Sequence, residues 1–222
     1  MQKGDHWRDW EIIELLGSGS FGKVYRIRRS GFDGFTEESA LKVIRIPQND
    51  SDYQLMLKDG MDEKSATVYF ETMVNELSRE FTLMSSLKGN SNIVSFEDYE
   101  VNRLTDRFGW EIVIRMELLE PLNESISKYG ITAEEIAKVG IDICKALELC
   151  EKEKIIHRDI NPENIFVSKY GDYKLGDFGI AKKLENATYS HTQMGTLSYM
   201  APEVYQGRPY NATADIYSLG LV

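Results

Sequence analysis

The stretch from His157 to Gly179, HRDINPENIFVSKYGDYKLGDFG, carries the densest group of chemically useful side chains in the chain. Asp159 and Asn164 lie in a polar loop, and two short β-like runs joined by a Gly-containing turn follow them. Asp177 comes directly after the second run. A carboxylate and an amide at these sites can hold a divalent cation through oxygen ligands, while another carboxylate is left to act as a base.

The chain as a whole divides into a β-rich first half and a helix-rich second half. We expect strands over 10–16, 23–28, 39–46, 93–101 and 110–117, the first three forming an antiparallel meander. An apolar stripe predicts a helix over 65–87, formed by Phe70, Val74, Leu77, Phe81 and Met84. A shorter helix is expected over 53–58.

The second half opens with a helix signal at Thr132 and Glu135, which have the spacing of a capping box. The apolar side of the predicted helix consists of Ile136, Val139, Ile143, Leu147 and Cys150. Another helix is expected to start at Asp215. These patterns predict an α+β fold of two lobes, residues 1–117 and 122–222, connected through 118–121.

Composition narrows the function classes. The 222 residues include 26 Lys and Arg against 36 Asp and Glu, a net charge of −10, which argues against nucleic-acid or membrane-surface binding. No run approaches the ~18 apolar residues of a spanning helix, and the N-terminus is no signal peptide. We expect a cytoplasmic protein, with any membrane anchor beyond residue 222. Cys144 and Cys150 are expected to be reduced thiols in or near a core.

A glycine-rich segment lies between the first two predicted strands and consists of Gly17, Ser18, Gly19, Ser20, Phe21 and Gly22. Glycines let backbone N–H groups approach a polyphosphate closely, although a tight β-turn also uses them. A dinucleotide-binding fold would place a helix after the glycines, and here a strand follows. The segment is therefore interpreted as a flap over phosphates.

These motifs, with Lys42 in the third predicted strand and Ala201-Pro202-Glu203, resemble the protein kinase family along the whole chain. The segment 195–203, GTLSYMAPE, is similar to that of Ser/Thr kinases, and the chain looks most like the bacterial eukaryotic-type members. The resemblance implies a two-lobed kinase fold that uses ATP and Mg²⁺ to phosphorylate protein Ser or Thr.

Roles follow from the resemblance by position. Lys42 would contact the α- and β-phosphates and pair with Glu80, with Glu76 as the alternative. Asp159 would orient or deprotonate the substrate hydroxyl, while Asn164 and Asp177 would hold Mg²⁺.

The resemblance also implies which residues bind the nucleotide. Besides Lys42, Asn164 and Asp177, they are Gly17, Ser18, Gly19, Ser20, Phe21, Gly22, Val24, Ala40, Met116, Glu117 and Leu119. Residues 116–119 look like the segment that contacts adenine, with Met116 in the gatekeeper position. Asp215 would brace the loop around Asp159 without reacting.

One departure from the family is Asn161, which stands where Ser/Thr members usually have a catalytic Lys. An amide donates a hydrogen bond but carries no charge, and a lost charge worth ~3 kcal/mol lowers the rate roughly a hundredfold. Asn161 is thus a candidate catalytic residue whose contribution to the rate is expected to be smaller than that of the usual Lys.

Three further features bear on activity. The chain stops soon after Asp215, which we interpret as a C-terminal truncation that exposes apolar surface and favours self-association. The segment 47–64 is longer than usual, and is either a tolerated insertion or a contact that positions the following helix. Phosphorylation of Thr188, Ser190 or Thr192 is expected to order its loop through Arg158.

The sequence thus predicts an ATP-dependent Ser/Thr protein kinase. Asn161 and the early end leave a nucleotide-binding pseudokinase or weakly active scaffold as an alternative. A small-molecule phosphotransferase of related fold is a second alternative, which the segment 195–203 disfavours.

Overall fold

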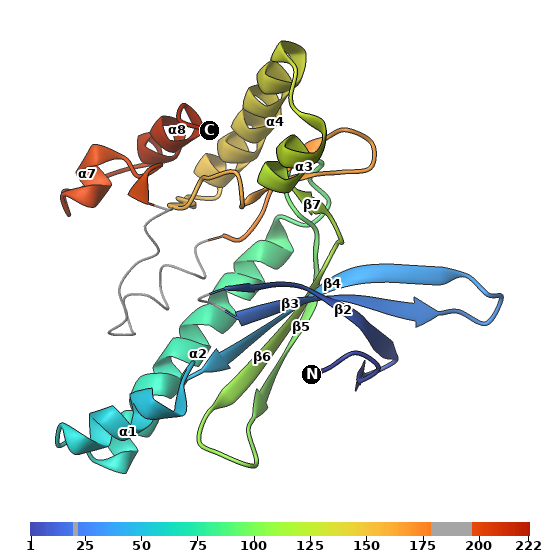
Figure 1. Cartoon of the computed structure of the whole chain (residues 1–222). Helices are drawn as coiled ribbons and strands as arrows, with labels where there is room; N and C mark the ends of the chain where they lie inside the picture. The colour runs from blue at the N-terminus through green and yellow to red at the C-terminus, as the bar shows by residue number, and fades with distance from the viewer. Residues whose placement is uncertain (20–21, 179–196) are drawn as a thin grey trace. The chain divides into compact units, whose positions relative to one another are not determined.

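The computed structural model describes residues 1–19, 22–178 and 197–222, without the side chains of Glu80 and Leu83 (Figure 1). The chain forms two compact units. The first contains Met1–Lys88 and Ser95–Leu118, and the second contains Gly89–Val94 and Leu119–Val222.

A curled antiparallel sheet forms most of the first unit. Its strands are β1 (His6–Trp7), β2 (Trp10–Gly19), β3 (Gly22–Ser30), β4 (Thr36–Ile46), β5 (Phe96–Arg103) and β6 (Trp110–Met116). The strand order is β1-β2-β3-β4-β6-β5, and each neighbouring pair is antiparallel. The expected meander is confirmed. The strand predicted at 93–101 begins only at Phe96, because Ile93 and Val94 belong to the second unit, where they pair with Leu175.

The two faces of this sheet bury different groups. One face holds an apolar cluster formed by Trp7, Trp10, Ile12, Tyr25, Ile27, Leu41, Val43 and Val113. Helix α2 (Glu63–Ser86) lies along the other face (Figure 1). The Phe81 ring of this helix contacts the rings of Phe96 and Tyr99. The shorter α1 (Asp50–Lys58) precedes it. Both predicted helices are present.

The second unit is mainly helical. It contains β7 (Glu120–Pro121), α3 (Leu122–Tyr129), α4 (Ala133–Lys152), β8 (Ile165–Val167), β9 (Tyr173–Leu175), α7 (Pro202–Tyr205) and α8 (Thr213–Leu219). The capping box predicted at Thr132 and Glu135 starts α4. Together the units confirm the α+β class. In the part of the chain with described coordinates, no helix is long and apolar enough to cross a membrane.

The prediction that Ile136 and Cys144 lie in or near the core is wrong. Ile136 is 58% exposed because α4 buries a narrower stripe that begins at Val139. Cys144 is exposed, whereas Cys150 is buried, and burial raises the pKa of its thiol to about 12. Both cysteines are free, as predicted.

Asp142 joins α4 to β9 through a buried carboxylate. It accepts hydrogen bonds from Lys138, from Lys145 and from the backbone N–H of Tyr173. Burial by itself raises the pKa of Asp142, but these hydrogen bonds outweigh it and the pKa is lowered. The ionised form is therefore the one that stabilises the fold.

We expect Asp142 to contribute to acid unfolding. Because its folded-state pKa lies below the unfolded value of about 3.9, its contribution is full above that pH and is lost as the pH falls through the folded pKa. Urea unfolding at pH 7 and at pH 3 should show a larger wild-type advantage over Asp142→Asn at pH 7 than at pH 3. An equal advantage at both values would contradict this role.

Candidate active site

The loop that carries Asp159 is fixed by a carboxylate from α8. Asp215, 2% exposed, accepts the backbone N–H of His157 through Oδ2 at 2.7 Å and that of Arg158 through Oδ1 at 2.8 Å. Arg158 has a φ of 70°, a left-handed backbone that such anchoring holds in place. The bracing role predicted for Asp215 is confirmed.

His157 supports the same loop from inside. Its ring is fully buried against Phe178, Nε2 lies 2.9 Å from the carbonyl oxygen of Gly176, and Nδ1 accepts from the N–H of Asp159 at 3.4 Å. Burial lowers the pKa of His157 although nearby carboxylates raise it. The neutral tautomer with a proton on Nε2 satisfies both contacts, so this histidine is a structural link and not an acid–base group.

The two carboxylate oxygens of Asp159 have different surroundings. Asn164 Nδ2 donates to Asp159 Oδ2 at 2.7 Å and to the Asp159 carbonyl at 2.8 Å. Oδ1 is shielded from solvent and has no hydrogen-bond partner among the described residues. One oxygen is thus held in place while the other is left to accept a proton or a hydrogen bond from a bound molecule.

The β8–β9 hairpin brings Asn164 close to Asp177. Asn164 precedes β8, and its carbonyl accepts the N–H of Gly176, which follows β9, at 2.9 Å. A Cβ at Gly176 would lie 2.7 Å from Val94 Cγ2 and 2.8 Å from the Phe166 ring, so only glycine fits there. Asp177, next in the chain, has a φ of 54°.

The oxygen donors at this open end of the hairpin suit a hard divalent cation. Asn164 offers Oδ1, because its Nδ2 is engaged by Asp159, and Asp177 offers a carboxylate. Among the described residues no group of three His, Cys, Asp or Glu forms a complete metal cage. Such a pair fits Mg²⁺, which commonly takes one or two protein carboxylates and completes its shell with phosphate oxygens and water.

Asn161 is built into the loop. It is 6% exposed, its Nδ2 donates to the carbonyl of Asp159 at 3.3 Å, and its Oδ1 accepts the N–H of Glu163 at 2.9 Å. This arrangement is an Asx turn, a role the sequence did not indicate.

In the first unit, the glycine-rich segment is the end of the β2–β3 hairpin. Gly17, Ser18 and Gly19 pair with Val24, Lys23 and Gly22, respectively. Gly22 has a φ of 133°, and a Cβ there would lie 2.1 Å from the Val43 carbonyl oxygen, so glycine is required for packing on β4. A Cβ at Gly17 would meet no heavy atom of the described chain within 4 Å. Ser20 and Phe21 lie outside the described residues.

Lys42 lies on the α2 face of the sheet. It is 6% exposed, and it pairs with Val24 on β3 and with Ile114 on β6, which in turn pairs with Tyr99. Residues directly opposite on neighbouring strands share a face, and Tyr99 contacts α2 through Phe81. The sheet therefore carries one buried ammonium group toward the helix.

Other predicted nucleotide contacts share that face. Ala40 is two residues before Lys42 and pairs with Met116, which is half-buried. Glu117 follows β6, donates its N–H to the Ser95 carbonyl at 3.0 Å, and accepts the Ser95 N–H through its side chain at 2.5 Å. Leu119, which begins the second part of the other unit, is half-buried.

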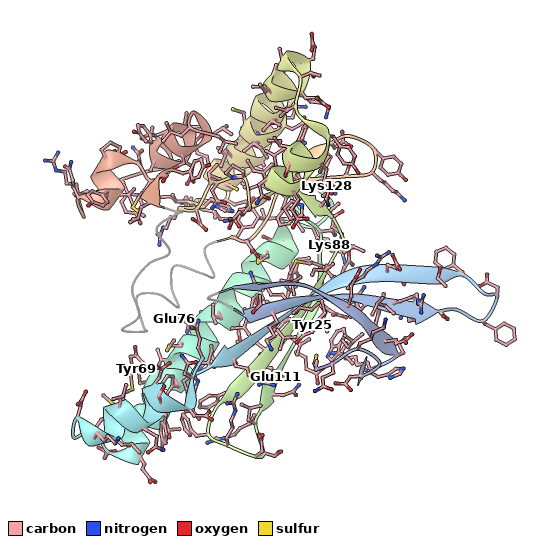
Figure 2. All side chains as sticks on the ribbon, in the orientation of Figure 1. Tyr25, Tyr69, Glu76, Lys88, Glu111 and Lys128 are labelled. Atoms are coloured by element: carbon pink, nitrogen blue, oxygen red, sulfur yellow. The ribbon has the colours of Figure 1, made fainter. Side chains whose placement is uncertain are left out.

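Of Glu80, the proposed partner of Lys42, the structure describes only the backbone. Position 80 is in α2, three residues after the buried Leu77, and its side chain is not described. The alternative, Glu76, is exposed (Figure 2). Gly179, Thr188, Ser190, Thr192 and the start of the segment 195–203 lie outside the described residues.

The sequence did not predict the role of Asn92, which supports the strand that leads to Asp177. Asn92 is 5% exposed, its Nδ2 donates to the carbonyl of Tyr173 at 3.0 Å, and its own carbonyl accepts the N–H of Leu175 at 2.9 Å. These hydrogen bonds hold β9 in place, and with it the backbone that leads to Asp177. An Asn followed by two apolar residues gave no local signal for this long-range contact.

Comparison with known proteins extends these observations. The family model described as "Protein kinase domain" matches residues 10–222. A "Probable serine/threonine-protein kinase" of Clostridium perfringens is 32% identical over 96% of the chain and 28% of its own length. "Serine/threonine-protein kinase Nek10" of Homo sapiens is 30% identical over 96% of the chain and 17% of its own length. "Serine/threonine-protein kinase 36" of Pongo abelii is 32% identical over 96% of the chain. The chain thus spans less than a third of these relatives' lengths.

Proposed function

Because the chain belongs to the protein kinase family, we propose that it transfers the γ-phosphoryl group of ATP to Ser or Thr hydroxyls of a protein substrate. The observation that carries the proposal is the pair of oxygens on Asp159. Asn164 fixes Oδ2, and Oδ1 has no partner among the described residues. A positioned carboxylate oxygen of this kind suits orientation of a hydroxyl nucleophile.

The proposed reaction forms a bond between the substrate oxygen and the γ-phosphorus as the bond to the β-phosphate oxygen breaks. Asp159 Oδ1 orients the hydroxyl and accepts its proton, while Asn164 keeps the carboxylate in place. Asn164 and Asp177 hold Mg²⁺, which when bound neutralises charge on the phosphates. Lys42 contributes a positive charge from the sheet, paired with Glu80 on α2.

The nucleotide is proposed to lie against the face of the sheet that carries Val24, Ala40, Lys42 and Met116. Gly17 supports this placement, because a Cβ there would meet nothing within the described chain and the backbone is open to a close ligand. Ser18, Gly19, Ser20, Phe21 and Gly22 are proposed to cover the phosphates, and Glu117 and Leu119 to contact the adenine.

The substrate class is supported by the printed names of the relatives, which are Ser/Thr protein kinases. Those names do not favour the pseudokinase alternative. We expect no nucleic-acid partner, because the net charge is −10. Self-association and a cytoplasmic location remain predictions of the sequence.

The proposal is tested by incubating the full chain with γ-labelled Mg-ATP and a generic protein substrate, followed by phosphoamino-acid analysis. We expect label on Ser or Thr, lost in Asp177→Ala and when Mg²⁺ is chelated. Nucleotide binding with no transfer would support the pseudokinase or scaffold alternative. Label on a small molecule alone would support a small-molecule phosphotransferase.

We expect Asn161→Lys to raise turnover by about tenfold with little change in ATP affinity. A charge near the transferring group is worth ~3 kcal/mol, but the substitution removes the Asx turn with Glu163, and each lost hydrogen bond costs ~1 kcal/mol. Steady-state kinetics measure kcat and the KM for ATP. Asn161→Ala, which loses the turn and gains no charge, is the matched control and should be slower than wild type. An Asn161→Lys turnover no higher than that of wild type would contradict the expectation.

A further inference from the structure

The segment between β4 and α2 is an ordered part of the first unit. Helix α1 begins after Asn49, whose backbone N–H donates to the Asp52 side chain at 3.4 Å. Asp62 then caps α2, accepting the N–H of Ser65 at 2.8 Å and its hydroxyl at 2.9 Å. Each helix therefore has its own start signal, and the segment is helical and not an extended loop.

An aromatic cluster connects α1 to the rest of the unit. The ring of Tyr53 stacks on Phe108, with centroids 3.9 Å apart and planes 15° apart. Phe108 lies edge-on to Phe70 of α2 at 5.7 Å and to Trp110 of β6 at 5.4 Å. Tyr69, labelled in Figure 2, meets the ring of Phe70 edge-on, with centroids 5.3 Å apart. Three elements that are separate in sequence meet at these rings.

The β5–β6 turn that carries Phe108 is itself fixed. Gly109 has a φ of 133°, and a Cβ there would lie 2.6 Å from the carbonyl oxygen of Ile46, where the segment begins. Arg107 forms an ion pair with Asp50 of α1 at 2.6 Å. The turn and α1 therefore contact each other at two points, one of stacked rings and one of opposite charge.

Helix α2 packs against the unit along its length, where Phe70, Leu77 and Phe81 are buried, and it makes aromatic contacts at two separate places. Phe81 contacts Phe96 and Tyr99 of β5 near one end of the helix. Phe70, 1% exposed, contacts Phe108 and Tyr53 about three turns away. A helix anchored at one place can tilt about it, whereas two anchors also fix its direction. Position 80 is next to the Phe81 contact, and the Phe70 contact helps to fix the direction of the helix on which position 80 lies.

We propose that α1 is a brace for α2, in which Tyr53 and Phe108 are positioning residues that keep Glu80 in reach of Lys42. This inference rests on the proposed function, because it acts through the Lys42–Glu80 pair. It favours the positioning contact over the tolerated insertion as the role of the segment 47–64. Loss of the Tyr53 ring lowers the fraction of molecules with α2 correctly placed, and turnover falls with that fraction.

The test compares kcat of the full chain and its variants with Mg-ATP and the generic protein substrate. Tyr53→Ala should lower kcat about three- to tenfold, the range expected for loss of one ring pair, with the KM for the protein substrate unchanged. Tyr53→Phe keeps the stack and should behave as wild type. Leu55→Ala, on the same helix at a 55% exposed position, is the matched control and should also be unchanged.

A double-mutant cycle separates positioning from general destabilisation. Glu80→Gln should itself lower kcat, and adding Tyr53→Ala to it should lower kcat no further, because the brace acts only through that carboxylate. If Tyr53→Ala unfolds at the assay temperature, Phe108→Leu replaces it, since it removes the same stack from the other side.

The outcomes are distinguishable. A wild-type chain without transfer defeats the proposed function. A transferring chain in which Glu80→Gln is impaired but Tyr53→Ala and Phe108→Leu are not defeats the brace alone. Independent, multiplicative losses in the double variant, or a fully active Glu80→Gln, also overturn the brace.

Discussion

Asp159→Asn is expected to reduce kcat by about 10²–10⁴-fold, the contribution typical of a positioned general base. The side chain keeps its size, and Asn164 can still donate to the amide oxygen where it now donates to Oδ2 at 2.7 Å. The loss therefore reports the missing carboxylate charge and not a displaced loop. ATP binding, which uses other residues, should change by less than about twofold.

The measurements are kcat for protein phosphorylation and the Kd for Mg-ATP from a fluorescent nucleotide. Glu163→Gln is the matched control, because it removes a carboxylate from the same loop at an exposed position. It should retain wild-type turnover. Turnover in Asp159→Asn within a factor of three of wild type would refute the proposed role of Oδ1.

Asp215→Ala is expected to lower the free energy of unfolding by about 4 kcal/mol. The change removes the acceptor for two backbone N–H groups, leaving that of His157 without a partner in a buried position and that of Arg158 without a partner in a partly buried one. Each such group costs about 1–3 kcal/mol. Because the same bonds fix the Asp159 loop, kcat of the folded fraction should fall as well.

Urea unfolding gives the free energy, and kcat is measured well below the transition. Asp215→Asn keeps one acceptor oxygen and should lose roughly half as much stability. Glu151→Ala, at an exposed position in the second unit, is the surface control and should stay within about 0.5 kcal/mol of wild type. A wild-type unfolding midpoint in Asp215→Ala would rule out the bracing role in stability.

The local patterns that predicted elements correctly are those with a cause confined to neighbouring residues. The capping box at Thr132 and Glu135 starts α4, and the stripe that includes Phe70, Leu77 and Phe81 is the buried side of α2. Helix α3 and the two-residue β1 were not predicted, because α3 has no side-chain cap at its start and β1 is too short to show a period. The exposed Ile136 shows the same limit, since periodicity gives the face of a helix but not how far a neighbour covers it.

The sequence by itself determined the family, the α+β class and the identities of the candidate site residues, because motif order and residue chemistry are carried by the chain without reference to its folding. Only the tertiary structure decided how those residues are held. It showed that Asp215 binds the Asp159 loop across 58 residues, that Asn161 closes a turn, and that one oxygen of Asp159 has no partner among the described residues. Each of these depends on contacts between distant segments, which form only when hydrophobic burial brings the segments together, so no local pattern contains them.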